Sequence, residues 1–284
     1  MKILRWIKQG ISYVYSDVNL LIPVALLLGL VGISLFGPVV WPIDPLFTDV
    51  SAALQAPSIN HPMGTDGTGR DVLARFIAGA RISLIVGTIV VVLGALIGGI
   101  TGLIAGTIGG RFDNVVMRIM DAILAFPPLI LAMAVTVGLG VGIQTAAVGI
   151  IIATIPWYAR VIRSDVLRIR SIQYIEAARA IGSSRTRIMS HHVIPNVIST
   201  LFVQASLSFG YAILALAALG FVGLGAQIPT PEWGAMITDG LKYALTGRWW
   251  IGFFPGLGLL IAVIAANSLG DRMRDILDPR HLTS

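Results

Sequence analysis

One segment of the chain has a residue spacing that could bind a phosphate. In GTDGTGRD, Gly64 and Gly69 are placed like the outer glycines of a phosphate-binding loop, whose backbone amides cradle phosphate oxygens. Arg70 stands where that loop has lysine, and Asp71 stands where it has serine or threonine. A carboxylate there would repel a phosphate, and the chain contains no Gly-Lys pair. We therefore interpret the segment as a glycine-rich turn and expect no nucleotide site.

Few other side chains offer catalytic or metal-binding chemistry. The chain has no cysteine, which excludes disulfides and thiolate metal sites. His61 stands alone before a proline, which favours a structural role. His191 and His192 are neighbours, and adjacent helical residues do not share a face. Neither paired aspartates nor an HExxH motif accompanies the apolar segments. We expect no catalytic residue and no metal site.

The composition excludes most soluble classes of protein. Of 284 residues, 56% are hydrophobic and only 12% are charged, and the mean hydropathy is +0.86. A soluble globular domain carries roughly 25% charged residues. The chain is therefore neither an ordinary soluble enzyme, nor a disordered tail, nor a nucleic-acid-binding domain, despite its net charge of +6.

Long uncharged runs predict an all-α integral membrane fold. A membrane-crossing helix needs about 20 mostly apolar residues. The longest central run, 122–159, is long enough for two spans, and the stretch 138–142 supplies a glycine-rich turn between them. The runs together predict six transmembrane helices, at 19–40, 82–107, 123–139, 142–159, 199–223 and 250–269.

The distribution of basic residues predicts the orientation. Segments 1–18, 108–121, 160–198 and 270–284 hold 15 of the 20 lysines and arginines, which places them in the cytoplasm. Segments 41–81 and 224–249 are then external loops, and the 270–284 tail and both termini are cytoplasmic. Residues 1–18 resemble an amphipathic helix on the membrane surface, although a frayed basic terminus remains an alternative. The first apolar run starts too late for a signal peptide and is predicted to be retained.

The predicted spans lack ionisable side chains, which usually mark ion or proton paths. An ion-coupled secondary transporter would need such a group near the midplane, so energy for transport would come from a partner. That transporter class and a non-transporting scaffold remain rival interpretations. Polar residues that could line a transport cavity are Gln144, Gln204, Tyr211 and Asn267.

A ladder of glycines in the second span predicts close helix packing. Its members are four residues apart, a spacing that lets helix backbones approach each other in membranes. The contact could lie within the chain or against another subunit. The ladder consists of Gly94, Gly98, Gly102, Gly106 and Gly110.

The basic loop 160–198 predicts a compact projection from the bundle. It holds seven arginines, and Ile172, Ile175, Ala178 and Ile181 follow at three-residue spacing, which predicts one face of a short helix. Gly182 suits the end of that helix, and Ser183 or Ser184 could cap a second one. A loop that faces anionic lipid is the alternative interpretation.

This loop resembles a known family. EAARAIG followed by HHVIP is similar to the EAA loop of importer permeases driven by ATP-binding-cassette (ABC) subunits, with His192 and Ile194 where that pattern has Ile and Leu. Stretches at 61–84, 117–132, 217–237 and 270–280 resemble the C-type permease of the dipeptide, oligopeptide and nickel branch. The matching residues of the loop are Glu176, Ala177, Ala178, Gly182, His192, Ile194 and Pro195.

The resemblance implies a type I ABC importer permease, with a core at 82–269, in a bacterial inner membrane. The EAA loop would seat in a cytoplasmic ATPase subunit, and ATP and magnesium would belong to two such subunits. A homologous permease would complete a heterodimer, and an external solute-binding protein would deliver substrate. Peptides are the expected substrate; nickel chelates, glutathione and other small amides stay open. Residues implied to face the binding protein are Asp66, Arg70, Asp71, Glu232 and Trp233.

Overall fold

The computed structural model describes residues 18–277, and within that range it contains helices and loops but no strand. The predicted surface helix at 1–18 lies almost entirely outside the described residues, as does the end of the predicted tail. The helices are α2 (Val18–Val40), η1 (Val50–Ala52), α3 (Val72–Ile108), α4 (Gly110–Leu124), α5 (Pro128–Leu139), α6 (Ile143–Arg170), α7 (Gln173–Ala180), α8 (Arg185–Ile188), the π-helix η2 (Met189–Val193), α9 (Ile194–Phe221), α10 (Trp233–Ala244) and α11 (Trp250–Leu277).

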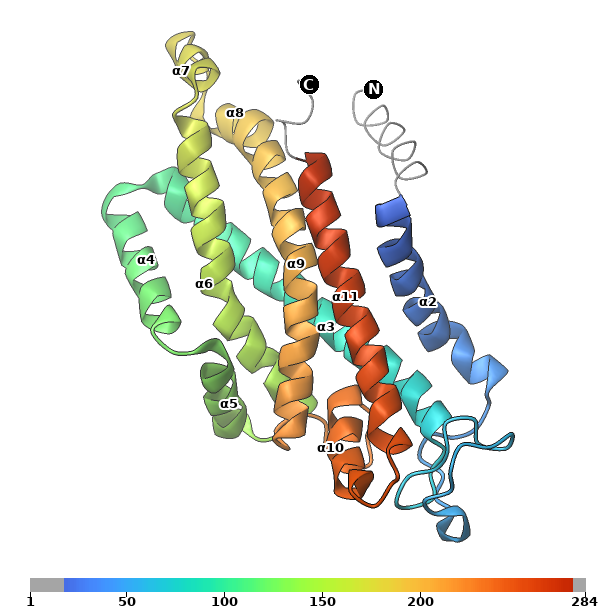
Figure 1. Cartoon of the computed structure of the whole chain (residues 1–284). Coiled ribbons are helices and arrows are strands. Elements are labelled where there is room, and N and C mark those ends of the chain that lie inside the picture. Colours follow the sequence, from blue (N-terminus) through green and yellow to red (C-terminus); the bar gives the residue numbers. More distant parts are fainter. Residues whose placement is uncertain (1–17, 278–284) are drawn as a thin grey trace.

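The long helices form a bundle with two different ends (Figure 1). Helices α2, α6, α9 and α11 run side by side along the bundle, and α3 crosses behind them. At one end, here called the loop end, α7 projects beyond the other helices with α8 below it, and the start of α2 and the end of α11 lie at this same end. At the other end, called the α10 end, α10 packs with the loop between α2 and α3 nearby.

Five helices are long and apolar enough to cross a membrane, and they match five of the six predicted spans. The third predicted span, 123–139, is wrong in its bounds. Its helix α5 begins only at Pro128 and meets α4 at a bend of 88°. Pro127 and Pro128 lack amide donors and cannot continue α4, whereas Pro128 suits the first position of a new helix. At twelve residues α5 is about 18 Å long, too short to cross alone, so the bent pair forms the sixth candidate span.

Several helices extend beyond the apolar segments that predicted them. Helix α3 starts ten residues before the predicted position, α6 runs on to Arg170, and α11 continues past 269 to Leu277. Hydropathy marks the part of a helix that suits hydrocarbon, whereas backbone hydrogen bonding continues through charged residues outside it. The sequence therefore located the spans better than the helix ends.

The glycine ladder lies against α6. A Cβ atom on Gly94 would come within 2.8 Å of the Thr154 hydroxyl, and one on Gly98 within 2.5 Å of the Ile155 carbonyl oxygen. Gly102 faces Ala159, one turn beyond Ile155 on α6, and Gly106 faces Val166, two turns beyond Ala159. Gly110 does not belong to this contact: it is the first residue of α4, has a positive φ and has open space around it. Including Gly110 in the ladder was therefore wrong, because α3 ends at Ile108.

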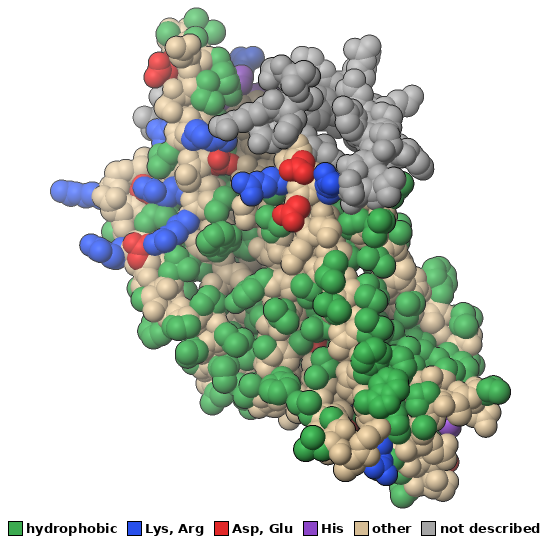
Figure 2. Space-filling view, viewed as in Figure 1, with side chains coloured by type: hydrophobic (Ala, Val, Ile, Leu, Met, Phe, Trp, Pro, Cys, Tyr) green, Lys and Arg blue, Asp and Glu red, His purple; other side chains and the backbone are tan. Residues whose placement is uncertain are grey.

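The surface of the bundle suits a lipid environment. Large apolar side chains are about half exposed on several helices, for example Ile100 on α3, Leu214 on α9 and Leu260 on α11. Figure 2 shows apolar side chains over the middle of the visible face, with most of the visible arginines and acids gathered towards the loop end. Soluble monomers rarely expose contiguous apolar surface of this extent.

Candidate coupling loop and the charged clusters at the two ends

The projecting loop folds as a helix, a glycine turn and a second short helix. Helix α7 ends at Ala180, and Gly182 takes φ +84°, a conformation that costs glycine little. The Ser183 amide donates to the Ala178 carbonyl oxygen at 3.0 Å, which closes the turn behind the helix. The Ser184 hydroxyl accepts from the Arg187 amide and caps α8. The sequence predicted both helices and this turn.

A small apolar core holds the loop onto the bundle. Ile175 of α7 is fully buried in a cluster with Ile162, Val166 and Ile169 of α6, Val193 of η2 and Val197 of α9. Its neighbours on the predicted apolar face behave differently, since Ile172 is partly exposed and Ile181 is 84% exposed. Helix α7 stops before Ile181, so only one isoleucine of that face is fully buried in the chain. Ile181 lies at the projecting tip, where it is open to a partner.

The residues of the EAA pattern are mostly solvent-accessible. Glu176, Ala177 and Gly182 are exposed on the projection, and Ala178 is half-buried. Pro195 is exposed in the first turn of α9, where a proline suits the helix start. His192 lies in the π-helix η2, and its ring centroid is 5.6 Å from that of Tyr174 on α7. The arrangement brings both halves of the pattern together at one end of the molecule.

Two ion pairs that sequence analysis did not identify fix α4 beside α6 at the loop end. The Arg163 guanidinium donates two hydrogen bonds to the Asp113 carboxylate, at 2.5 and 2.6 Å. Arg160 pairs with Asp121 one turn along α6. The basic residues were counted only as a signal of orientation, and spacing within one helix gives no sign of a pairing between two.

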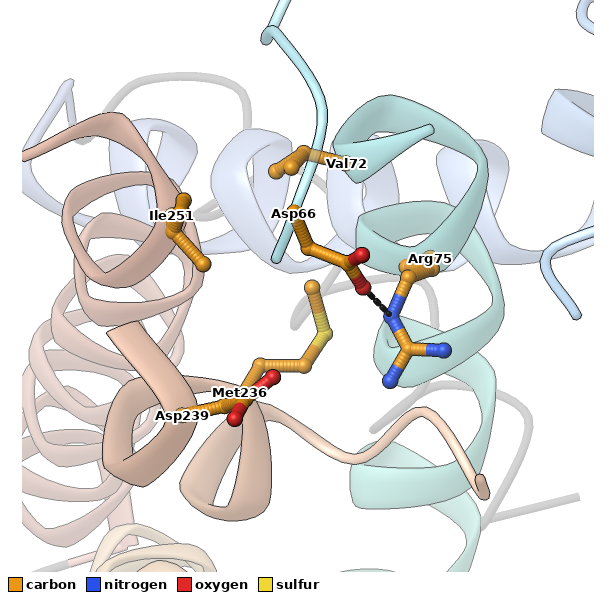
Figure 3. A pocket seen from close by; sticks show the side chains of 6 residues that line it. All are labelled: Asp66, Val72, Arg75, Met236, Asp239 and Ile251. Carbon is orange, nitrogen blue, oxygen red and sulfur yellow. Dashed lines mark ion pairs between the residues drawn. The ribbon is translucent and has the colours of Figure 1, made fainter. Parts of the chain in front are cut away.

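At the α10 end a buried ion cluster joins segments far apart in the chain. The Arg70 Nε atom donates to the Asp66 carboxylate at 2.6 Å, and the Arg75 Nε atom lies 3.5 Å from the same oxygen. Arg75 also donates to the carbonyl oxygens of Pro45 and Pro229. In Figure 3 the Arg75 side chain reaches from α3 towards Asp66, with Asp239 of α10 nearby. The cluster thus ties the loop between α2 and α3, α3 itself and the segment before α10 together.

Electrostatics favour the ionised form of Asp66 although its side chain is buried. Burial alone would raise the pKa of this carboxyl. Hydrogen bonds from the Thr68 amide and hydroxyl and the charge of Arg70 outweigh burial, and they hold the pKa of Asp66 below its usual value. The GTDGTGRD segment is therefore a turn built around a carboxylate, with Gly64 and Gly69 at positive φ.

Asp71 joins three parts of the α10 end. Its carboxylate accepts from the Ala74 amide at 2.7 Å and so caps the start of α3. It also accepts from the Trp41 indole, next to the end of α2, at 3.1 Å. The His61 Nδ1 atom lies 2.8 Å from its other oxygen, which gives His61 a structural partner. No group of metal-ligating side chains occurs in the described part of the chain.

Glu232 and Trp233 lock α10 into the bundle. The Glu232 carboxylate accepts from the Gly234 and Ala235 amides and from the Ser83 hydroxyl of α3. Burial raises the pKa of Glu232, against the effect of these hydrogen bonds. The Trp233 indole is fully buried, stacks on Phe76 and donates to the Phe76 carbonyl oxygen at 3.2 Å.

These positions correct one expectation from the sequence. The side chains implied to face a binding protein are all at most 6% exposed, so they form the interior of the α10 end rather than a contact surface. Charged residues in a loop suggested exposure, but the four charged side chains of this set are ion-paired or hydrogen-bonded within the chain. The residues concerned are Asp66, Arg70, Asp71, Glu232 and Trp233.

An apolar groove of about 340 Å³ opens between α2, α3, α9 and α11. Its walls include Leu27 of α2, Val91 of α3, Phe209 of α9 and Leu269 of α11, with Thr88 and Ser206 as its hydroxyl groups.

The four polar residues chosen as cavity candidates do not line this groove. Gln204 accepts from the Trp157 indole, Asn267 lies against Gly210, and Gln144 and Tyr211 are exposed on the surface of the chain. Their role in lining a transport cavity stays a prediction.

A bundle of spanning helices with a projecting basic loop defines a multi-pass membrane permease. Residues 98–282 match the family described as binding-protein-dependent transport system inner membrane component, and the chain belongs to that family. The chain is thus a permease subunit of an ABC importer in the bacterial inner membrane, a transport component rather than an enzyme. Such a subunit works with ATP-hydrolysing and substrate-binding partners.

Named relatives cover nearly the whole chain. The probable D,D-dipeptide transport system permease protein DdpC of Escherichia coli (strain K12) is 39% identical over 98% of this chain and 91% of its own length. The dipeptide transport system permease protein DppC of Alkalihalophilus pseudofirmus is 42% identical over 87% of this chain and 81% of its own. DppC of Escherichia coli (strain K12) is 44% identical over 87% of this chain and 84% of its own.

A solved structure supports the fold. A chain of the MetNI methionine ABC transporter, in inward-facing conformations, aligns with a TM-score of 0.58 and 22% identity, covering 72% of this chain and 96% of its own. At this identity the likeness concerns the fold alone.

Proposed function

We propose that this permease imports di- or oligopeptides delivered by an external solute-binding protein. The single observation that carries the proposal is its identity of about 40% with dipeptide permeases over nearly the whole chain. We further propose that it pairs with a homologous permease and with two ATPase subunits that bind ATP and magnesium. Both termini, α7 and α8 would lie in the cytoplasm, as the count of basic residues predicts.

The projection α7–α8 is the element that suits an ATPase contact. It extends beyond the bundle (Figure 1) at the end where basic side chains gather (Figure 2), and it exposes Tyr174 and Ile181. Its base is anchored through Ile175 to both α6 and α9. A force applied to the tip would therefore reach two spanning helices instead of bending a free loop.

The mechanism that fits this arrangement is alternating access driven by the ATPases. ATP binding would draw the ATPase pair together and displace α7, and the helix bundles of the two permeases would then open outward to receive peptide. Hydrolysis would restore the inward-facing state. Moving such an equilibrium from 1:99 to 99:1 requires about 5.5 kcal/mol of differential binding, which nucleotide binding would have to supply through this loop.

Co-purification tests the proposal most directly. The chain is purified in mild detergent from its native membrane, the accompanying subunits are identified, and ATP hydrolysis is assayed with binding protein and with or without dipeptide. We expect a second permease, an ATPase pair and peptide-stimulated hydrolysis. Recovery of the chain alone, or stimulation by a nickel chelate or glutathione but not by any peptide, would contradict peptide import.

Variants of the projection test its coupling role. Glu176→Arg reverses a charge on its exposed surface, and Gly182→Pro removes the residue with positive φ, which proline cannot adopt. We expect both variants to insert in the membrane but to lose peptide uptake. Normal uptake by both would show that the projection does not couple the ATPases to transport.

A further inference from the structure

Arg170 connects the base of the projecting loop to the end of α3. It is the last residue of α6 and lies three positions before α7. Its Nη1 atom donates to the carbonyl oxygen of Gly106 at 2.5 Å and to that of Thr107 at 3.0 Å. Both carbonyls belong to the last turn of α3, where a helix has no amide of its own to satisfy them. A cation there also complements the helix dipole, so Arg170 caps α3 from another helix.

The other side of the loop reaches the same turn. The Thr107 hydroxyl lies 3.7 Å from the Met189 sulfur in η2, the π-helix that leads from α8 into α9. Gly106 fits closely against α6, because a Cβ on it would come within 2.9 Å of the Val166 Cβ atom. The last turn of α3 is therefore held between the segment that enters the projection and the segment that leaves it.

Helix α3 continues from this turn to the opposite end of the bundle. Its 37 residues make a rod about 55 Å long. At its other end, Asp71 caps its first turn and Arg75 joins the buried ion cluster with Asp66. The glycine ladder packs the middle of the rod closely on α6. A displacement of the last turn of α3 would therefore be carried along the helix to the α10 end.

We propose that Arg170 is a positioning residue that transmits displacement of α7 to α3. The inference rests on the proposed function, since it assumes that an ATPase moves α7. When the guanidinium is lost, the ATPases still seat on the projection and hydrolyse ATP, but α3 no longer follows. The complex then hydrolyses more ATP for each peptide that it imports.

The test measures ATP hydrolysed per peptide imported. The full complex is reconstituted in liposomes with its binding protein and a labelled dipeptide, and Arg170→Met is compared with the parent. We expect the ratio to rise about tenfold, within the range of typical coupling energies between distant sites. ATPase retention on the complex should stay unchanged. The matched control is Arg168→Met, since Arg168 is exposed on the same helix end and pairs with Asp165 of its own helix, three residues earlier.

Several results would overturn the inference. An unchanged ratio in Arg170→Met would do so, as would an equal rise in Arg168→Met, which would indicate a general effect of loop charge. If Arg170→Met does not assemble, Arg170→Lys decides, because the lysine ammonium lies on a shorter side chain than the Arg170 Nη1 atom that donates to both carbonyls. We expect a smaller rise there, and an unchanged ratio would refute the role. If the parent complex shows no peptide-dependent ATP hydrolysis, the proposed function itself fails.

Discussion

At the scale of single residues, a paired carboxylate organises the α10 end. Asp66 receives hydrogen bonds from Thr68 and lies against both Arg70 and Arg75. Asp66→Asn would leave two buried guanidinium groups with weakened partners, and breaking a buried pair in this way costs about 3–5 kcal/mol. We expect a clear fall in the thermal unfolding midpoint in detergent. Asp44→Asn, on an exposed carboxylate of the same loop, serves as the control and should be nearly neutral.

The same residue predicts a pH dependence. The pKa of Asp66 is held below its usual value, so its ionised form stabilises the fold at every pH above the unfolded-state pKa of about 3.9. That contribution is lost as pH falls through the lower folded-state pKa. Unfolding midpoints of the parent and Asp66→Asn should therefore differ by a constant amount from pH 7 to about pH 4 and converge as the pH falls further. A difference that stays constant well below that pH would show that Asp66 is not the titrating group.

At the scale of elements, the contact between α3 and α6 depends on glycine. A Cβ atom on Gly102 would meet backbone atoms of Ala159, which cannot move aside as a side chain could. Gly102→Ala should therefore destabilise the chain by about 1–3 kcal/mol, the usual cost of overpacking. Gly32→Ala is the matched control, because Gly32 of α2 has open space around it and alanine favours a helix. Equal unfolding midpoints for the two variants would show that the ladder is not a tight contact.

At the scale of the whole molecule, the orientation can be tested with single cysteines, because the natural chain has none. Ile59 in the loop at the α10 end is 95% exposed, and Ile181 at the projecting tip is 84% exposed. In intact spheroplasts, a membrane-impermeant maleimide should label Ile59→Cys directly. It should label Ile181→Cys only after the membrane is permeabilised. The reverse pattern would refute the proposed orientation, because the projection would then lie on the side of the membrane opposite the ATPases.

The sequence by itself determined the class of protein and the position of its projecting loop. Uncharged runs located five spans because water-free surroundings demand apolar side chains wherever a helix crosses. Gly182 fixed the turn after α7 because a positive φ suits glycine. The third span was misplaced because an apolar segment has the same mean hydropathy whether its helix is continuous or broken at a proline. Only the backbone path shows that α4 ends before α5 begins.

Tertiary structure alone decided which charged residues are buried and which helices they join. The Asp66–Arg70–Arg75 cluster, the Arg163–Asp113 pair and the Arg170 cap on α3 connect residues from different segments. Hydropathy reports the preference of one side chain for water, whereas burial of a charge depends on a partner supplied by another element. For that reason the sequence suggested an exposed charged loop at the α10 end, whereas in the structure the same residues are buried inside that end.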